Sequence, residues 1–153
     1  MGILPIPNSI LNEGGVHLDV MVSSKEEAIT RCAKYLEDMG ATTSQYLGGM
    51  LERESIISSY LGKKVAIPHG TDPARAFVKF GQLIFMRLKE EILWDDEPVA
   101  LVIAIAAKGE EQVDVLGNLA ECILDDDTYK ILMESPDAHE ILAVINDRKG
   151  LEP

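Results

Sequence analysis

Cysteine is scarce in this sequence, and so are basic side chains and long apolar runs. The two cysteines, Cys32 and Cys122, lie far apart in half-apolar stretches and form no CxxC or Cys/His pattern. That spacing is not typical of a zinc site or an iron–sulfur cluster, whose ligands recur at short, regular intervals. We therefore expect no metal and no cofactor, and two buried, reduced thiols of a cytoplasmic protein.

The charge balance excludes one class of partner, and the hydropathy pattern excludes a membrane span. Fourteen Lys and Arg stand against 26 Asp and Glu, for a formal net charge of −12. A surface this acidic repels phosphate backbones, so we expect no nucleic-acid partner and favour a basic protein partner. The longest apolar run, residues 99–107, is far shorter than the about 20 apolar residues of a membrane-spanning helix. The amino terminus lacks the pattern of a signal peptide, and no direct membrane insertion is expected.

Length and patterning predict one domain over residues 1–153, with residues 1–14 as a loose lead-in. A chain of this size buries a sufficient core without metals or disulfides. Apolar residues alternate over 16–22, which is typical of a half-buried strand. Ser24 and Glu27 then form a capping-box sequence that opens a helix, and Gly40 is suited to end it.

The run at 99–107, VALVIAIAA, has no alternation, which predicts a strand covered on both faces. Further strands are expected at 65–67 and 78–88, and a helix at 44–53. More helices are expected after Gly109, and the first of them has an apolar stripe of Val113, Leu116, Leu119, Ala120 and Ile123. Because helices alternate with strands, the predicted fold class is α/β, a central mixed β-sheet with helices on both faces.

Only one of the three histidines follows a strand in a position suited to chemistry. His17 lies on the outward side of the alternating strand and His139 in the first turn of the last helix, so we expect both at the surface. His69 stands between Pro68 and Gly70, directly after a short apolar strand, and ligands in open α/β sheets bind where strands end in loops. On spacing alone, a loop histidine held for structural reasons is an equally good interpretation. The sequence has no P-loop, GxGxxG or GxSxG motif.

The wider segment LERESIISSYLGKKVAIPHGT, residues 51–71, carries several pieces in a fixed order. These are the Arg-Glu pair at 53–54, Tyr-Leu-Gly at 60–62, an apolar strand, and Pro-His-Gly-Thr at 68–71. Together they resemble the active-site region of the mannitol/fructose-type enzyme IIA domains of the bacterial phosphoenolpyruvate-dependent sugar phosphotransferase system. The mannitol branch is the most similar, and the resemblance covers roughly residues 24–145.

The resemblance implies a phosphocarrier, a phosphotransferase with a phosphohistidine intermediate. By position, His69 accepts a phosphoryl group from the carrier protein HPr and passes it to a cysteine of enzyme IIB, which phosphorylates sugar entering through the membrane enzyme IIC. Arg53 matches the family arginine, whose guanidinium donates to the phosphoryl oxygens. An isolated Glu-Arg-Glu would instead indicate a surface ion pair of Arg53 with Glu52 or Glu54.

This chain departs from the family pattern at one site position. The family has a second histidine at the start of the helix after the buried strand, where this sequence has Gln112. A glutamine donates hydrogen bonds but carries no charge and shares no proton. Gln112 either keeps a hydrogen bond to the phosphoryl group, near a helix N-terminus that favours anions, or is a plain polar helix residue.

A second function class stays open beside the sugar-specific carrier. Enzyme IIA-like modules of the nitrogen-related type have the same fold and signal their phosphorylation state by binding target proteins. The mannitol-like motifs favour the transport carrier, and the missing second histidine favours the regulatory module. In both, the predicted site residues are His69, Arg53 and Gln112.

Overall fold

The computed structural model describes residues 11–109 and 111–150, with the side chains of the last four left out. The strands are β1 (Val16–Val20), β2 (Tyr60–Gly62), β3 (Val65–Ala66), β4 (Gln82–Trp94) and β5 (Glu97–Ala106). The helices are α1 (Lys25–Asp38), α2 (Tyr46–Ile56), α3 (Glu111–Leu124), α4 (Asp126–Glu134) and α5 (Ala138–Gly150), with short 3-10 turns η1 (Glu13–Gly15) and η2 (Pro73–Phe77).

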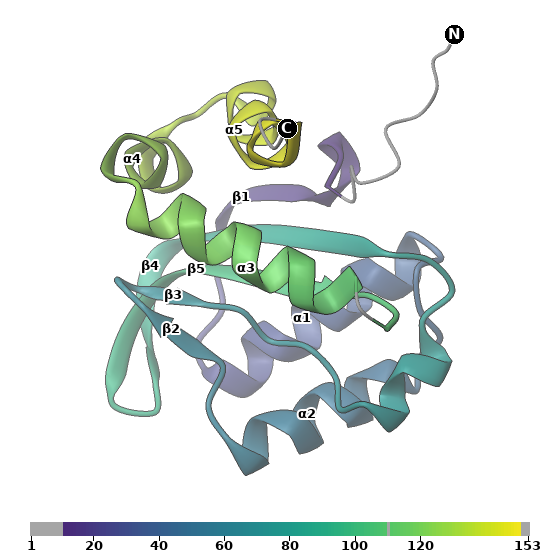
Figure 1. The fold of residues 1–153 in the computed structure, drawn as a ribbon. Helices are drawn as coiled ribbons and strands as arrows, with labels where there is room; N and C mark the ends of the chain where they lie inside the picture. The colour runs from purple at the N-terminus through teal and green to yellow at the C-terminus, as the bar shows by residue number, and fades with distance from the viewer. Residues whose placement is uncertain (1–10, 110, 151–153) are drawn as a thin grey trace, which may run out of the picture.

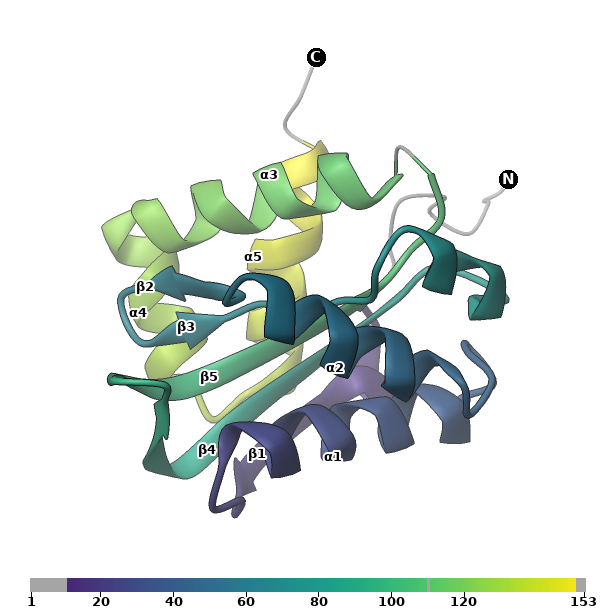
Figure 2. The ribbon, with the colours of Figure 1, turned by 90° about the horizontal axis from the view of Figure 1, so that it is seen from below.

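The described strands form one mixed sheet in the order β1-β4-β5-β3-β2. β1 runs parallel to β4 and β3 parallel to β5, whereas β4 pairs with β5 and β2 with β3 in antiparallel fashion. Helices α1 and α2 cover one face, and α3, α4 and α5 cover the other (Figures 1 and 2). The predicted α/β class, with a mixed sheet between two helical layers, is confirmed.

β5 is the central strand, and both of its faces are buried. Val102, Ala104 and Ala106 belong to the core under α1 and α2, and the intervening residues belong to the core under α3, α4 and α5. Alternate side chains of a strand point to opposite faces, so a strand between two helical layers is apolar at every position. This explains why the segment shows no alternation, as its sequence predicts.

α1 begins and ends where its sequence predicts. The Ser24 hydroxyl accepts a hydrogen bond from the backbone N–H of Glu27 at 3.1 Å, and Gly40 has a φ of +80° after the last turn. The reciprocal bond of the box is shifted by one residue, because the Glu27 carboxylate accepts from the N–H of Ser23 at 2.8 Å. The apolar face of the helix, with Ala28, Ile29, Cys32 and Leu36, is buried.

Both cysteines are buried, as expected, one under each helical layer. Burial raises the pKa of the Cys32 thiol to about 12. The predicted lead-in falls mostly outside the described residues. At its described end Leu11 is 1% exposed and η1 forms a turn, so this part belongs to the folded domain.

The prediction of a strand over residues 78–88 is wrong in its extent. β4 starts at Gln82 and continues to Trp94, where Asp95, with a φ of +59°, makes the tight turn into β5. The register shifts between Arg87 and Ile92 because the ladder bulges, and the polar residues 89–91 on the bulge are exposed. A bulge interrupts the alternation that marks a strand in the sequence.

The expected stripe of α3 is wrong at its first position, because Val113 is 66% exposed. The buried face consists of Gln112, Val115, Leu119, Cys122 and Ile123. The two candidate stripes share their carboxyl-terminal residues, so helical spacing alone does not distinguish them. The packed helix is rotated so that Gln112 faces inward and Val113 faces solvent.

His17 is not the solvated side chain that the alternation predicts, whereas His139 is exposed as expected. The His17 ring stacks on Tyr35 of α1 with 3.7 Å between ring centroids, and its Nε2 is buried with no hydrogen-bond partner among the described residues. Burial lowers the pKa of His17, and a backbone hydrogen bond at Gly14 opposes this. The imidazole is therefore neutral in the native state at neutral pH.

This burial predicts a loss of stability in acid. Because the native pKa of His17 lies below the ordinary value of 6.5, the unfolded chain takes up a proton first, and the free energy of unfolding falls as the pH drops below that value. His17→Phe keeps the stack on Tyr35 and removes the titrating group. In urea unfolding at about pH 7.5 and about pH 5.5, the variant should lose less stability than the wild type. Equal losses would contradict the prediction.

Candidate active site

His69 lies where the chain leaves the sheet beside the carboxyl end of β5. Its backbone forms a parallel bridge with Ile105, and the Ile105 N–H donates to the Pro68 carbonyl at 3.0 Å. The segment after β3 therefore extends the sheet by a few residues before it turns away at Gly70. Figure 2 shows that this segment and the start of α3 lie at the same end of the sheet.

The His69 ring is held in one tautomer. Its Nδ1 lies 2.9 Å from the Ile67 carbonyl oxygen, which only accepts hydrogen bonds, so Nδ1 carries the proton and donates. Nε2 of the neutral ring consequently keeps its lone pair. The side chain sits in a sheltered position, since His69 is 7% exposed.

The electrostatic surroundings of His69 favour the neutral ring. Burial lowers the pKa of His69, and the hydrogen bond to Ile67 opposes this effect. The positive charges of Arg53 and Arg75 lower the pKa of His69 further, and the negative charge of Glu54 raises it. Both guanidinium groups are thus within electrostatic range of the ring, which is neutral at neutral pH.

Tyr46 holds the backbone next to His69. Its buried hydroxyl donates to the Ile105 carbonyl at 2.8 Å and accepts from the Gly70 N–H at 2.9 Å, so it joins the loop to β5. A Cβ atom at Gly70 would lie 2.6 Å from Cε1 of Tyr46, which is closer than such atoms approach. Gly70 is therefore required by the close contact with Tyr46.

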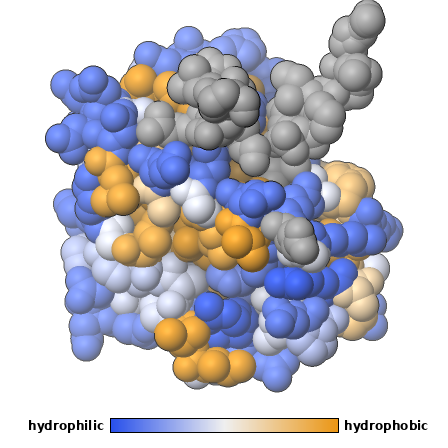
Figure 3. All heavy atoms as spheres, viewed as in Figure 1, coloured by the Kyte–Doolittle hydropathy of each residue, from blue (hydrophilic) through white to orange (hydrophobic). Residues whose placement is uncertain are grey.

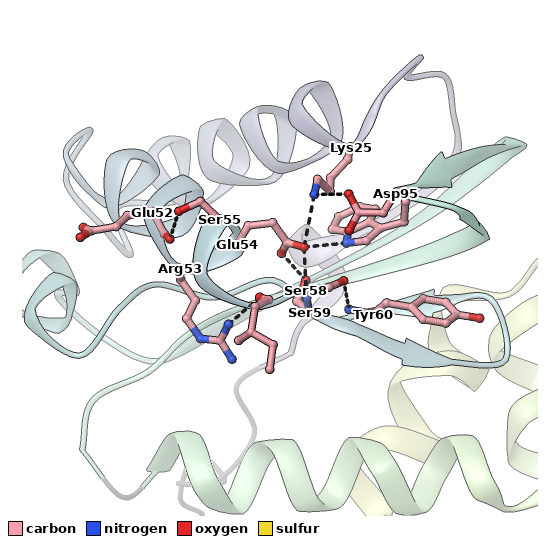
Figure 4. A network of polar contacts seen from close by, with 11 residues as sticks. Lys25, Glu52, Arg53, Glu54, Ser55, Ser58, Ser59, Tyr60 and Asp95 are labelled. Atoms are coloured by element: carbon pink, nitrogen blue, oxygen red, sulfur yellow. Dashed lines mark hydrogen bonds and ion pairs between the residues drawn. The ribbon is translucent and has the colours of Figure 1, made fainter.

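Arg53 lies in the last turns of α2 and does not form the surface ion pair that an isolated Glu-Arg-Glu suggests. Its Nη1 donates to the Ile57 carbonyl at 2.8 Å, and the side chain points away from Glu54 (Figure 4). No ion pair of Arg53 with Glu52 or Glu54 is found in the described part of the chain.

Arg75 acts electrostatically on His69, and the sequence reasoning did not predict this. It belongs to η2, where its Nη2 lies 3.1 Å from the Asp72 carboxylate, and its Nε is buried without a hydrogen-bond partner among residues 11–109 and 111–150. The available signal was the Asp72-Pro73 turn directly after the Pro-His-Gly-Thr motif, because a tight turn brings the next residues back toward His69.

Gln112 is the second residue of α3, at the end of the sheet that carries His69. It is 7% exposed, and its Oε1 is buried without a hydrogen-bond partner in the described part of the protein. The structure contains no hydrogen bond between Gln112 and His69, so the two share an end of the sheet without a direct polar contact. The burial of Gln112 nevertheless differs from what is expected of a plain polar residue on the surface of a helix.

Several large apolar side chains are exposed to solvent. Figure 3 shows them along α3 and at the foot of α2. The exposed large apolar residues of these elements and their neighbours are Leu51, Ile56, Ile57, Leu61, Phe80, Val113 and Leu124. Within the described residues, no group of three or more His, Cys, Asp or Glu is placed to hold a metal ion, and no helix has the length and apolarity to cross a membrane.

Comparison with known proteins identifies this arrangement. Residues 9–148 match the family model described as phosphoenolpyruvate-dependent sugar phosphotransferase system, EIIA 2. The mannitol-specific phosphotransferase enzyme IIA component of Staphylococcus aureus is 33% identical over 140 residues, which cover 92% of this chain and 97% of the relative.

Two solved structures have the same fold over almost their whole length. Enzyme IIA-mannitol of Escherichia coli, in its complex with phosphorylated enzyme IIB-mannitol, matches with a TM-score of 0.81 and 28% identity over 89% of this chain and 96% of that one. Nitrogen regulatory protein IIA-Ntr of Neisseria meningitidis matches with a TM-score of 0.78 and 27% identity, over 90% of this chain and 97% of that one. The chain belongs to the EIIA 2 family of the phosphoenolpyruvate-dependent sugar phosphotransferase system.

Proposed function

We propose that His69 accepts the phosphoryl group from phospho-HPr at Nε2 and passes it to enzyme IIB of a mannitol uptake system. The observation that carries this proposal is the hydrogen bond from Nδ1 of His69 to the Ile67 carbonyl at 2.9 Å. With Nδ1 protonated and engaged, Nε2 is the nitrogen with a free lone pair. Since burial lowers the pKa of His69, that lone pair is available at neutral pH.

In the first transfer, the Nε2 lone pair of His69 attacks the phosphorus, and a new N–P bond forms as the N–P bond to the histidine of HPr breaks. The HPr imidazole leaves with the electron pair of the broken bond. The His69 ring gains positive charge, which the Ile67 carbonyl stabilises through the Nδ1–H hydrogen bond. In the second transfer, a cysteine thiolate of enzyme IIB attacks the same phosphorus, and Nε2 takes its electron pair back.

Arg53 and Arg75 provide the positive charge that the phosphoryl oxygens require in this reaction. Phosphoryl transfer depends on in-line positioning and on stabilisation of charge on the equatorial oxygens. The two arginines lie on α2 and η2, and both act electrostatically on the His69 ring. Gln112 supplies a neutral amide donor from the start of α3, where the backbone N–H groups also favour an anion.

Mannitol is the sugar that the relatives favour. The similar enzyme IIA components of Staphylococcus aureus and Bacillus subtilis, 33% and 31% identical to this chain, are both mannitol-specific. The exposed apolar residues Ile56, Ile57 and Val113 offer a docking face for the protein partners. Sugar recognition then lies in the IIB and IIC components that receive the phosphoryl group.

A regulatory role is the second candidate, and it rests on the likeness to IIA-Ntr. The TM-score of 0.78 to that protein is close to the 0.81 to IIA-mannitol. Gln112 also replaces the second histidine of the mannitol pattern. A regulatory module would take up phosphate from phospho-HPr without passing it to enzyme IIB of a mannitol system.

The proposal predicts that the phosphate is carried on His69. After incubation with phosphoenolpyruvate, enzyme I and HPr, the label should be lost in acid and retained in alkali, as expected for a phosphoramidate. His69→Ala should remove the label and keep the fold, with His139→Ala as the matched control that labels normally. Label on another residue would overturn the assignment. Subsequent transfer to mannitol-type enzyme IIB would support the transport role, and no transfer would favour the regulatory one.

The arginine role predicts slower transfer without loss of the fold. A charged hydrogen bond contributes ~1.5–3 kcal/mol, so Arg53→Ala should slow single-turnover transfer from phospho-HPr about tenfold or more. Arg75→Ala should slow it in the same way. Arg31→Ala, on the outer part of α1, is the control and should transfer at the wild-type rate. Wild-type rates in both site variants would contradict the role of these guanidinium groups.

The proposed role of Gln112 predicts a smaller loss of transfer rate when its side chain is removed, and a pH-dependent gain when it is replaced by histidine. A neutral hydrogen bond contributes ~0.5–1.5 kcal/mol, so Gln112→Ala should slow transfer only severalfold. Gln112→His keeps a donor and adds a group that becomes charged as the pH falls toward ~6, so its transfer rate should exceed the wild-type rate most at low pH. If both variants match the wild type in single-turnover measurements at two pH values, Gln112 is a bystander.

A further inference from the structure

Glu54 is a buried carboxylate that lies outside the reaction just described. It is 7% exposed, at the end of α2, and it is surrounded by hydrogen-bond donors (Figure 4). Ser59 donates to it twice, from its N–H at 3.1 Å and from its hydroxyl at 2.6 Å. Trp94 donates from Nε1 at 2.9 Å, and the Lys25 ammonium lies 3.8 Å away. A buried charge needs partners of this kind, so the site is built for a carboxylate.

The contact between Glu54 and Ser59 is linked through the backbone to His69. The Ser59 carbonyl accepts from the N–H of Ile67 at 3.0 Å. The carbonyl of the same Ile67 accepts from Nδ1 of His69 at 2.9 Å. Ile67, whose carbonyl fixes the tautomer of His69, is therefore held at its N–H by Ser59, and Ser59 is held by Glu54.

The same segment also directs Arg53. Residues 57–59 connect α2 to β2, and Ser59 is the buried residue of the three. The first residue of this segment, Ile57, is 60% exposed, and its carbonyl accepts the hydrogen bond of the Arg53 guanidinium. The Ile57 carbonyl lies between two fixed points, its own N–H bonded to the Arg53 carbonyl at 3.3 Å and the anchor at Ser59 two residues on, so a loss of that anchor frees one side of the segment that directs the Arg53 side chain.

We propose that Glu54 is a positioning residue for phosphoryl transfer, because it anchors residues 57–59, which contact Arg53 directly and His69 through Ile67. In this role Glu54 acts through Ser59, in addition to the direct effect of its negative charge on the His69 ring. The inference rests on the proposed function of His69, and it adds a residue to which that proposal gives no role. Lys25, itself paired with Asp95 at 2.7 Å, compensates the buried charge at the far side.

The donors around the anchor bind a carboxylate more strongly than an amide. Three donor groups, two from Ser59 and one from Trp94, point at the two oxygens of Glu54. A glutamine side chain has one oxygen and an NH₂ group that only donates. Glu54→Gln can keep its oxygen against the two N–H donors only by turning its NH₂ toward the Ser59 hydroxyl, which then has to accept instead of donate. It also removes the negative charge that these donors and Lys25 face, so the contacts to Ser59 weaken although the two side chains have nearly the same shape.

The test measures the His69 tautomer and the transfer rate in the same variants. ¹⁵N chemical shifts of the imidazole report which ring nitrogen is protonated, without any partner protein. Glu54→Gln should turn the single Nδ1–H tautomer into a mixture and slow single-turnover transfer from phospho-HPr about tenfold, a loss equivalent to ~1.4 kcal/mol. The rates are compared at saturating phospho-HPr, because Ile57 belongs both to this segment and to the proposed docking face. Ser59→Ala, which removes one of the bonds to Glu54, should shift both readouts in the same direction.

Two controls separate positioning from mere destabilisation. Glu52→Gln makes the same chemical change on an exposed position of the same helix and should alter neither readout. Leu132→Ala, a fully buried core change under the opposite helical layer, should lower the unfolding midpoint and leave the tautomer as it is. The double variant Glu54→Gln/Ser59→Ala should be no slower than the more affected single variant, because both act through one contact.

The outcomes distinguish this inference from the proposed function. An unchanged tautomer and rate in both Glu54→Gln and Ser59→Ala would overturn the positioning role, even if His69 carries the phosphate. Equal slowing by Leu132→Ala at the same loss of stability would also overturn it. If His69 is never labelled by phospho-HPr, the proposed function fails, while the tautomer measurement still decides whether Glu54 positions the ring.

Discussion

The hydrogen bond from Nδ1 of His69 to the Ile67 carbonyl is the interaction on which the proposed chemistry depends. A free imidazole exchanges its proton between two nitrogens, and either nitrogen can then act as the nucleophile. At 2.9 Å the Ile67 carbonyl, which has no proton to donate, leaves one arrangement. The acceptor belongs to a peptide that continues the sheet beside β5, the central strand, so the orientation of the ring is tied to the core of the domain.

The fold holds the His69 segment rigidly and surrounds it with positive charge. The two apolar cores on opposite faces of the sheet hold β5 and β3 between them, and the Tyr46 hydroxyl joins the loop to β5. The positive charges of Arg53 and Arg75 come from α2 and η2, two elements outside the sheet. The charges of Arg53 and Arg75 and the burial of His69 both lower the pKa of His69, so the features that suit a phosphoryl group also keep the nucleophile neutral.

Two buried polar side chains of the domain, Glu54 and Gln112, differ in how well their polar atoms are satisfied. Glu54 has its donors and its counter-charge, and in our proposal it holds the segment that orients the reacting groups. Gln112 has an amide oxygen without a partner in the described chain, at the start of a helix. Unsatisfied buried polar groups destabilise a fold, and they are retained where a ligand or partner satisfies them. The role proposed for Gln112 uses its NH₂ group, because a phosphoryl oxygen accepts hydrogen bonds and cannot satisfy the amide oxygen.

The sequence by itself determined the α/β class, the cap of α1, the doubly buried β5 and the segment around His69, because these follow from local patterns and a continuous motif. Tertiary packing decided which face of α3 is buried, why His17 is sheltered by Tyr35, and which groups act on His69. Arg75 reaches the site through a tight turn, and Tyr46 and Trp94 contact backbone or side chains far away in the chain. Such contacts depend on how far each helix is rotated and where each strand bulges when two helical layers pack on a sheet. The spacing of residues along the chain does not determine this rotation or the position of the bulge.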